Sequence, residues 1–278
     1  MTNNHLLIYR LAELMLEKQQ HILALDDLFE DEQIDAFVRS IQIDSPYQQL
    51  IFEGVLTETI KEERVMVTFT VEGYFHYVLG EVIEKQTLDK EAKALKELLE
   101  NNKLRGITEG VEQCLVRDVE KNDLSRLMWL IDEGGKALEA SAYPLAQAYT
   151  TINIDTVNNT LFSKISMNDI QVLSRCTKIL YEKKSKSLNF LYKSLIKFQK
   201  KVRYDEFKII LIEAYSSLSK KDLNEIKIPN LKSKNISLQF RINYEMIYLY
   251  KKLNLYEKAE SIINQNIELI KFYKSAFE

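Results

Sequence analysis

Glycine and proline are scarce in this sequence, and their scarcity constrains the fold more than any other feature. The 278 residues include seven glycines and three prolines, and residues 151–278 contain no glycine and a single proline, Pro229. These two residue types interrupt helices most strongly. The hydrophobic share, 46%, is ordinary for a globular protein. We therefore expect a mainly α-helical protein without low-complexity or broadly disordered regions.

Apolar residues recur at helical spacing along most of the chain. The pattern predicts a helix over 6–20, a short helix within 32–41, and a helix that starts at Ser45 and Pro46, where serine can cap and proline is tolerated. Beyond Thr87 it predicts helices with short polar connections, which favour antiparallel pairs stacked in sequence. These helices are expected at 88–101, 107–120, 123–133, 135–151, 168–182, 187–201, 204–218, 236–252 and 256–275.

One segment departs from helical spacing. Val55–Thr59 and Arg64–Thr70 are rich in β-branched residues and flank a short charged sequence. They predict a β-hairpin, which is followed by a helix over 72–85. No other segment has a comparable strand pattern, so we expect this hairpin to be the whole of the β-structure.

The sequence YLYKKLNLYEKAESII resembles a tetratricopeptide repeat. Tyr250, Tyr256, Ala259 and Ile263 stand where that repeat has two aromatic residues, a small residue and a bulky residue. A small residue lets two helices cross closely, and aromatic residues fill the wider gaps. We predict that these four residues pack between helices in an α-helical repeat domain that spans 87–278.

Charge is divided unevenly along the chain. Residues 1–150 carry 15 Lys and Arg against 28 Asp and Glu, a balance of −13, whereas residues 151–278 carry 23 against 13, a balance of +10. Such an asymmetry indicates two differently built segments, which either have different partners or dock on each other.

The basic residues are densest between 178 and 203, where aromatic residues lie among them. Lysines beside aromatic residues can hold a phosphate backbone and stack bases. The same pattern also fits a solvated helix face whose aromatic residues belong to the core. The candidate partner-binding residues are Lys183, Lys184, Lys186, Lys193, Lys197, Lys200, Lys201 and Arg203, and the interleaved aromatic residues are Tyr181, Phe190, Tyr192 and Phe198.

Motifs for catalysis, metal binding and nucleotide binding do not occur in the sequence. His5, His21 and His76 have no zinc-ligand spacing, and Cys114 and Cys176 form no CxxC pair, so we expect two buried thiols. The phosphate-binding pattern GxxxxGK[ST] is absent, as are GxGxxG and GxSxG. We therefore expect no metal, no cofactor and no autonomous catalysis, with an unrecognised carboxylate enzyme as a residual alternative.

The sequence also carries no membrane signal. No apolar run reaches the roughly 18 to 20 residues that a spanning helix needs. The first residues lack a basic segment and a signal-peptide cleavage site. We therefore expect a soluble, cytoplasmic protein without a membrane partner.

The segment VMVTFTVEGYFHYVLGEVI resembles the end of the winged-helix domain in STAND signal-transduction ATPases of the NACHT and NB-ARC type. In that family, a strand that ends in Phe runs into a helix of the form F-x-H-E-x-x-x-x-Y-L-L-A. The family's phosphate-contacting histidine would fall on Val71. The corresponding residues are Phe69 and Thr70 at the strand end, Glu72 at the acidic position, Tyr77, Val78 and Leu79 on the apolar helix face, and Gly80 at the small position.

This resemblance implies a winged-helix-like domain over residues 1–86, followed by a repeat array that senses a ligand. It also implies an ATPase core, as a preceding domain or a partner subunit, because the Walker motifs do not occur here. Our leading hypothesis is a non-catalytic interaction or sensor module that binds a protein or peptide. The alternative is a nucleic-acid-binding regulator that uses the basic C-terminal half, since the predicted helix within 32–41 of the winged-helix-like domain carries Glu32 and Asp35 and would repel DNA.

Overall fold

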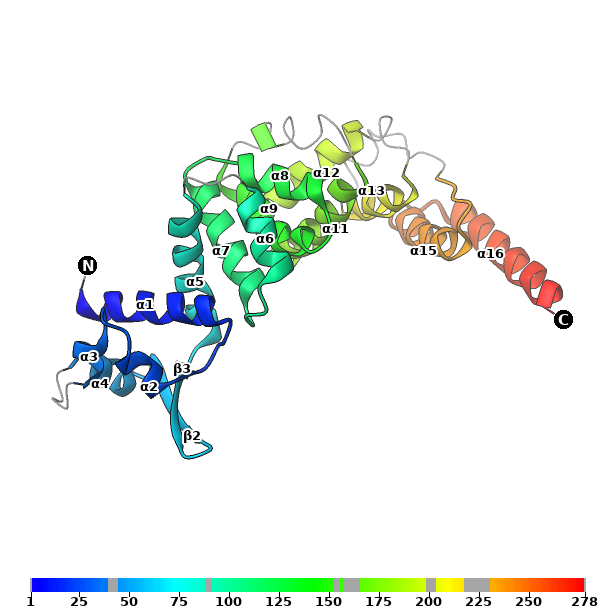
Figure 1. The fold of residues 1–278 in the computed structure, drawn as a ribbon. Coiled ribbons are helices and arrows are strands. Elements are labelled where there is room, and N and C mark those ends of the chain that lie inside the picture. The colour runs from blue at the N-terminus through cyan, green and yellow to red at the C-terminus, as the bar shows by residue number, and fades with distance from the viewer. Residues whose placement is uncertain are drawn as a thin grey trace. The chain divides into compact units, whose positions relative to one another are not determined.

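The computed structural model describes residues 2–39, 45–88, 92–152, 156–157, 166–198, 204–217 and 231–277. Most of these residues lie in helices, and a small antiparallel sheet lies near the N-terminus (Figure 1). The prediction of a mainly α-helical protein is therefore confirmed. Contacts between Cα atoms divide the chain into two compact units, Met1–Thr151 and Ile152–Glu278, which we call unit 1 and unit 2.

Most helices and both strands of the predicted hairpin lie where the pattern predicts them, with shifts at their ends. The helix expected from residue 88 begins at Lys93, and the helix Leu25–Phe29 lies outside the helices predicted above. Unit 1 contains α1 (Asn3–Lys18), β1 (Leu23–Ala24), α2 (Leu25–Phe29), α3 (Asp35–Arg39), α4 (Pro46–Phe52), β2 (Leu56–Lys61), β3 (Arg64–Phe69), α5 (Glu72–Thr87), α6 (Lys93–Asn101), α7 (Ile107–Glu120), α8 (Ser125–Glu133) and α9 (Ala137–Thr151). Unit 2 contains α11 (Met167–Glu182), α12 (Ser187–Phe198), α13 (Asp205–Ser217), α15 (Ile236–Lys252) and α16 (Tyr256–Phe277).

The sheet in unit 1 has three strands in the order β1-β3-β2, and both pairings are antiparallel. The predicted hairpin is confirmed as β2 and β3, with Leu56 opposite Phe69. The expectation that it forms the whole of the β-structure is wrong, because Leu23 of β1 pairs with Val67 of β3. Two residues are too few to show the alternation that identifies a strand in a sequence.

Two glycines allow α5 and α7 to pack closely in unit 1. A Cβ atom on Gly80 would lie 2.5 Å from the Cβ of Gln113, and one on Gly110 would lie 2.7 Å from Leu79. Helix α7 also packs against α9, and α5 packs against α1. These contacts join the helices after residue 87 to the elements before it.

The boundary between the two units therefore differs from the predicted domain boundary at 86/87. The division falls between residues 151 and 152, because α5 contacts both α1 and α7 and so joins the two sides of the predicted boundary. The change in charge balance falls at the same place. Unit 1 carries the balance of −13, and unit 2 carries the balance of +10.

A buried ion pair ties α8 to the rest of unit 1. The guanidinium of Arg126 donates to both carboxylate oxygens of Asp118, at 2.7 and 2.8 Å, and to Thr87 Oγ1 at 2.8 Å. Only 14% of the Arg126 side chain is exposed. A buried charge without a hydrogen-bonding partner is unfavourable. These hydrogen bonds therefore hold α5, α7 and α8 together.

In unit 2, helices that follow one another in the chain pack together (Figure 1). Extensive contacts join α12 to α13, α13 to α15, and α15 to α16. The turns after α11 and α15 have the same backbone conformation. Lys184 and Asn254 are both left-handed, with φ of 50° and 61°. The next amide in each turn, that of Ser185 or Leu255, donates back to a carbonyl of the last helical turn at 2.9 Å.

Candidate functional site

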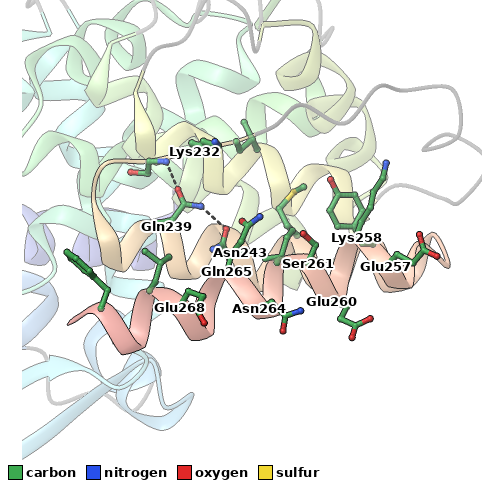
Figure 2. Close-up of a pocket in the computed structure, with 17 residues that line it drawn as sticks. Lys232, Gln239, Asn243, Glu257, Lys258, Glu260, Ser261, Asn264, Gln265 and Glu268 are labelled. Atoms are coloured by element: carbon green, nitrogen blue, oxygen red, sulfur yellow. Dashed lines mark hydrogen bonds between the residues drawn. The ribbon is translucent and has the colours of Figure 1, made fainter. Parts of the chain in front are cut away.

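A groove of about 1310 Å³ lies between α15 and α16 in unit 2, and we call it the α15–α16 groove (Figure 2). One wall is the face of α15 that carries Gln239, Asn243, Met246 and Tyr250, which follow one another at helical spacing. The facing wall belongs to α16 and carries polar and apolar side chains, which include Ser261, Ile262, Asn264, Gln265, Glu268, Leu269 and Phe272.

A chain of side-chain amides joins the α15 wall of this groove to α16. Gln239 Nε2 donates to Asn243 Oδ1 at 2.7 Å, which Figure 2 shows as a dashed line, and Gln239 Oε1 accepts from the Ser233 amide at 2.6 Å. Asn243 Nδ2 then donates to Asn266 Oδ1 on α16 at 2.6 Å. A primary amide has two donor hydrogens and an acceptor oxygen. These hydrogen bonds use one donor hydrogen each of Gln239 and Asn243.

The segment Leu231–Ser233 forms one edge of the groove and is held by α13. The Ser233 hydroxyl donates to the carboxylate of Asp205, and Lys208 Nζ donates to the same carboxylate at 2.5 Å. These two hydrogen bonds hold the pKa of Asp205 below its ordinary value. The Leu231–Ser233 edge is therefore held by the carboxylate of Asp205, which does not line the groove.

The rim of the groove carries charges of both signs. Glu257, Glu260 and Glu268 line it with Lys232 and Lys258, and Lys271 Nζ lies 3.1 Å from Glu268 Oε1. Lys258 Nζ lies 5.8 Å from the ring centroid of Tyr250, close enough for a cation–π contact. The charges of opposite sign at this rim are therefore balanced.

The four predicted repeat-packing residues occupy different positions. Ala259 is 3% exposed on α16, which packs against α15, and Tyr250 is half-buried in the groove. Tyr256 is 63% exposed and Ile263 is 39% exposed, so neither side chain is enclosed between helices. The reason is that α15 is the one described helix that packs extensively on α16, and it covers the face that carries Ala259.

The predicted partner-binding lysines lie at the surface where the structure describes them. Lys183, Lys184 and Lys186 are exposed at the turn between α11 and α12, and Lys193 and Lys197 are exposed on α12. Lys200, Lys201 and Arg203 lie outside the described residues, as do the side chains of Phe190 and Phe198. Of the two remaining aromatic residues, Tyr181 is 67% exposed and Tyr192 is 4% exposed.

A smaller pocket of about 330 Å³ lies on α11, α12, α13 and α15. Its charged residues are Lys178, Glu213, Arg241 and Glu245, and Arg241 Nη2 lies 3.1 Å from Glu213 Oε1. Burial and the nearby Glu213 raise the pKa of Glu245. The charges of opposite sign in this pocket are balanced, so it offers no preference for a charged ligand.

Reactive or metal-binding groups are not brought together in the described residues. Cys114 and Cys176 are both 0% exposed, and burial raises the pKa of the Cys114 thiol to about 12. Among the side chains that the structure places, no three His, Cys, Asp or Glu residues could hold a metal ion. Within the same part of the chain, no helix has the length and apolar character needed to cross a membrane.

Sequence reasoning did not single out the chain of amides that joins the α15 wall of the groove to α16. Gln239, Asn243 and Asn266 are separated along the chain, and amide side chains have no periodicity that marks them as partners. The one local signal is the spacing of Gln239, Asn243, Met246 and Tyr250 on one face of a predicted helix.

Comparison with known proteins finds no matching family model, no matching curated protein and no matching solved structure.

Proposed function

We propose that this chain is a non-catalytic interaction module that binds a peptide segment of a partner protein in the α15–α16 groove. The observation that carries the proposal is the combination of side-chain amides and apolar groups in one groove. Backbone N–H and C=O groups of a peptide match the donors and acceptors of amides such as Gln265 and Asn264. Apolar side chains of the same peptide can contact Met246, Leu269 and Phe272.

The size and charge of the groove define the partner further. Small-molecule sites are commonly about 300 to 1,000 Å³ and enclose most of the ligand, and this groove is larger. Its rim has charges of both signs, so it favours a peptide that carries both basic and acidic side chains beside its apolar residues.

The resemblance to STAND ATPases supports a place for this chain in a signalling switch of that class. The element order from α1 to β3 and the strand order β1-β3-β2 support a winged-helix-like arrangement before α5. The paired helices of unit 2 support a tetratricopeptide-like array, because stacked helix pairs provide extended surfaces for proteins. We therefore propose an ATPase domain or subunit as a further partner in a STAND-type switch.

Affinity capture with the full chain tests the groove. The wild-type chain should recover a specific protein, and Phe272→Glu should abolish that recovery, because Phe272 is 65% exposed in the groove. Tyr244→Glu is the matched control, since Tyr244 is 69% exposed on α15 and does not line the groove. Recovery of the bait alone, or equal recovery by both variants, would contradict the proposal.

The exposed lysines support a second candidate, nucleic-acid binding. Lys183, Lys184 and Lys186 lie together at one turn, with the exposed Tyr181 close in sequence. Binding of single-stranded nucleic acid should then weaken steeply with salt and should be lost when the three lysines are changed to glutamate. Lys93→Glu in unit 1 serves as the control, and absence of binding at low salt would exclude this candidate.

A further inference from the structure

The pocket of about 330 Å³ on α11, α12, α13 and α15 falls in the size range of small-molecule sites, and we call it the four-helix pocket. Its α11 wall presents Lys178 and Tyr181, which lie three residues apart and so share one face of the helix. The other residues that line it are Ser174, Thr177, Tyr192, Glu213, Ser216, Arg241 and Glu245. Charged, hydroxyl and aromatic side chains from four helices therefore meet in one pocket of small-molecule size.

One pair of opposite charges in the four-helix pocket is already matched. Arg241 Nη2 donates to Glu213 Oε1 at 3.1 Å. Lys178 on α11 and Glu245 on α15 line the same pocket. Neither of these two side chains forms an ion pair with any residue in the part of the chain that the structure describes. The pocket therefore presents one cation and one anion that the charges of a ligand can match.

Glu245 lies where a negative charge is unfavourable. The residue is half-buried, whereas Lys178 is exposed. Burial and the nearby Glu213 raise the pKa of Glu245, although Arg241 acts in the opposite direction. A positive group beside the Glu245 carboxylate would offset both the burial and the repulsion by Glu213. This part of the pocket therefore favours the cationic group of a ligand.

We propose that the four-helix pocket binds a free amino acid with an uncharged side chain, with its ammonium group at Glu245 and its carboxylate at Lys178. A ligand with only one of these charges would leave Glu245 or Lys178 unmatched. A charged side chain on the ligand would meet only Arg241 and Glu213, which already pair with each other. An apolar side chain can instead contact the ring of Tyr181, which lines the pocket and is 67% exposed.

The four-helix pocket and the α15–α16 groove use different faces of α15. Arg241 and Glu245 line the pocket, and Asn243 lines the groove. Residues two apart in a helix point about 200° away from each other, which is roughly half a turn. Helix α15 accordingly packs against α13 as well as α16. Binding of an amino acid therefore does not rest on the proposed binding of a peptide, and either can fail without the other.

Isothermal titration of the full chain with L-phenylalanine and with L-leucine tests the proposal. At least one of the two should bind saturably. Its methyl ester lacks the carboxylate charge, and its N-acetyl derivative lacks the ammonium group. Each derivative should therefore bind about tenfold more weakly or worse, because a charged hydrogen bond is lost. Failure of both amino acids to bind would overturn the proposal, and so would a derivative that binds as tightly as the free amino acid.

Two variants assign each charge of the ligand to its residue. Lys178→Gln and Glu245→Gln should each weaken binding about tenfold or more. Lys178→Gln should no longer discriminate against the methyl ester, and Glu245→Gln should no longer discriminate against the N-acetyl derivative. Lys186→Gln and Glu206→Gln are the matched controls, since both residues are exposed in unit 2 and do not line the pocket. Circular dichroism of each variant separates loss of binding from loss of folding, and folded variants that discriminate like the wild type would overturn the assignment.

Discussion

Asn243 Nδ2 donates a hydrogen bond to Asn266 Oδ1 at 2.6 Å and so joins α15 to α16 beneath the groove. Asn243 is 6% exposed, and its oxygen accepts from Gln239. A buried amide that loses its partners pays a desolvation penalty that an exposed amide does not. This pair is therefore one of the contacts that hold together the two helices that form the walls of the groove.

Asn243→Ala should lower the free energy of unfolding of unit 2 by about 1 to 3 kcal/mol, because Gln239 and Asn266 lose a buried partner. Urea denaturation followed by circular dichroism measures the change. Asn264→Ala is the control, since Asn264 is exposed on the same groove wall and should change the stability by less than about 0.5 kcal/mol. Equal losses for both variants would show that the buried bond has no special role.

Gly80→Ala should destabilise unit 1 by about 1 to 3 kcal/mol, because the new Cβ would meet Gln113 where α5 packs on α7. Gly73→Ala provides the comparison in the same helix, where a Cβ would meet nothing within 4 Å. That variant should be neutral or slightly stabilising, since alanine is the better helix former. Thermal unfolding of both variants separates close packing from helix propensity.

Labelling of the two thiols should report the opening of each unit separately. Cys114 lies in unit 1 and Cys176 lies in unit 2, and burial raises the pKa of both thiols. The thiolate is the reactive form, so alkylation in the native protein should be about a hundredfold or more slower than in urea. Peptide mapping by mass spectrometry assigns the rate to each cysteine, and native rates equal to those in urea would contradict the burial.

Asp205→Asn should loosen the edge of the groove at neutral pH, because Asp205 accepts hydrogen bonds from Lys208 and Ser233. The pKa of Asp205 is lowered from its ordinary value of 3.8 in the folded protein. Its stabilising effect is therefore complete above that value and is lost as the pH falls through the lowered pKa. Hydrogen exchange of the Ser233 amide should differ between wild type and variant at neutral pH and converge in acid. A difference that persists in acid would assign the effect to something other than the carboxylate charge.

The sequence was most informative where packing is local. The spacing of Ile107, Val111 and Leu115 predicts α7, and the β-branched run before Phe69 predicts β3. Each element could be predicted because its own residues carry the periodicity of a buried face. The same reasoning could not find β1, whose two residues form a strand only through their pairing with β3.

The candidate site is formed by contacts between separate helices. Less of it than of the individual helices could therefore be predicted from the sequence. Ala259 is buried as a small residue at a helix crossing, but Tyr256 and Ile263 are exposed although their residue types match the repeat. A repeat motif indicates which residues a neighbouring helix would contact. It does not indicate whether that helix is present. The lysines at 183, 184 and 186 are predicted from a basic stretch with interleaved aromatic residues, and that pattern gives no indication of the groove elsewhere in unit 2.

The two turns at Lys184 and Asn254 have a consequence for the unfolded chain. Each places a residue with a side chain in the left-handed region, at a cost of about 1 kcal/mol compared with glycine. Glycine at these positions would relieve the strain, but it would also give the unfolded chain more conformations to lose on folding. Because residues 151–278 contain no glycine at all, unit 2 begins folding from a narrower ensemble than an ordinary segment of its length. Folding of unit 2 therefore loses less backbone conformational entropy per residue than folding of a segment that contains glycine.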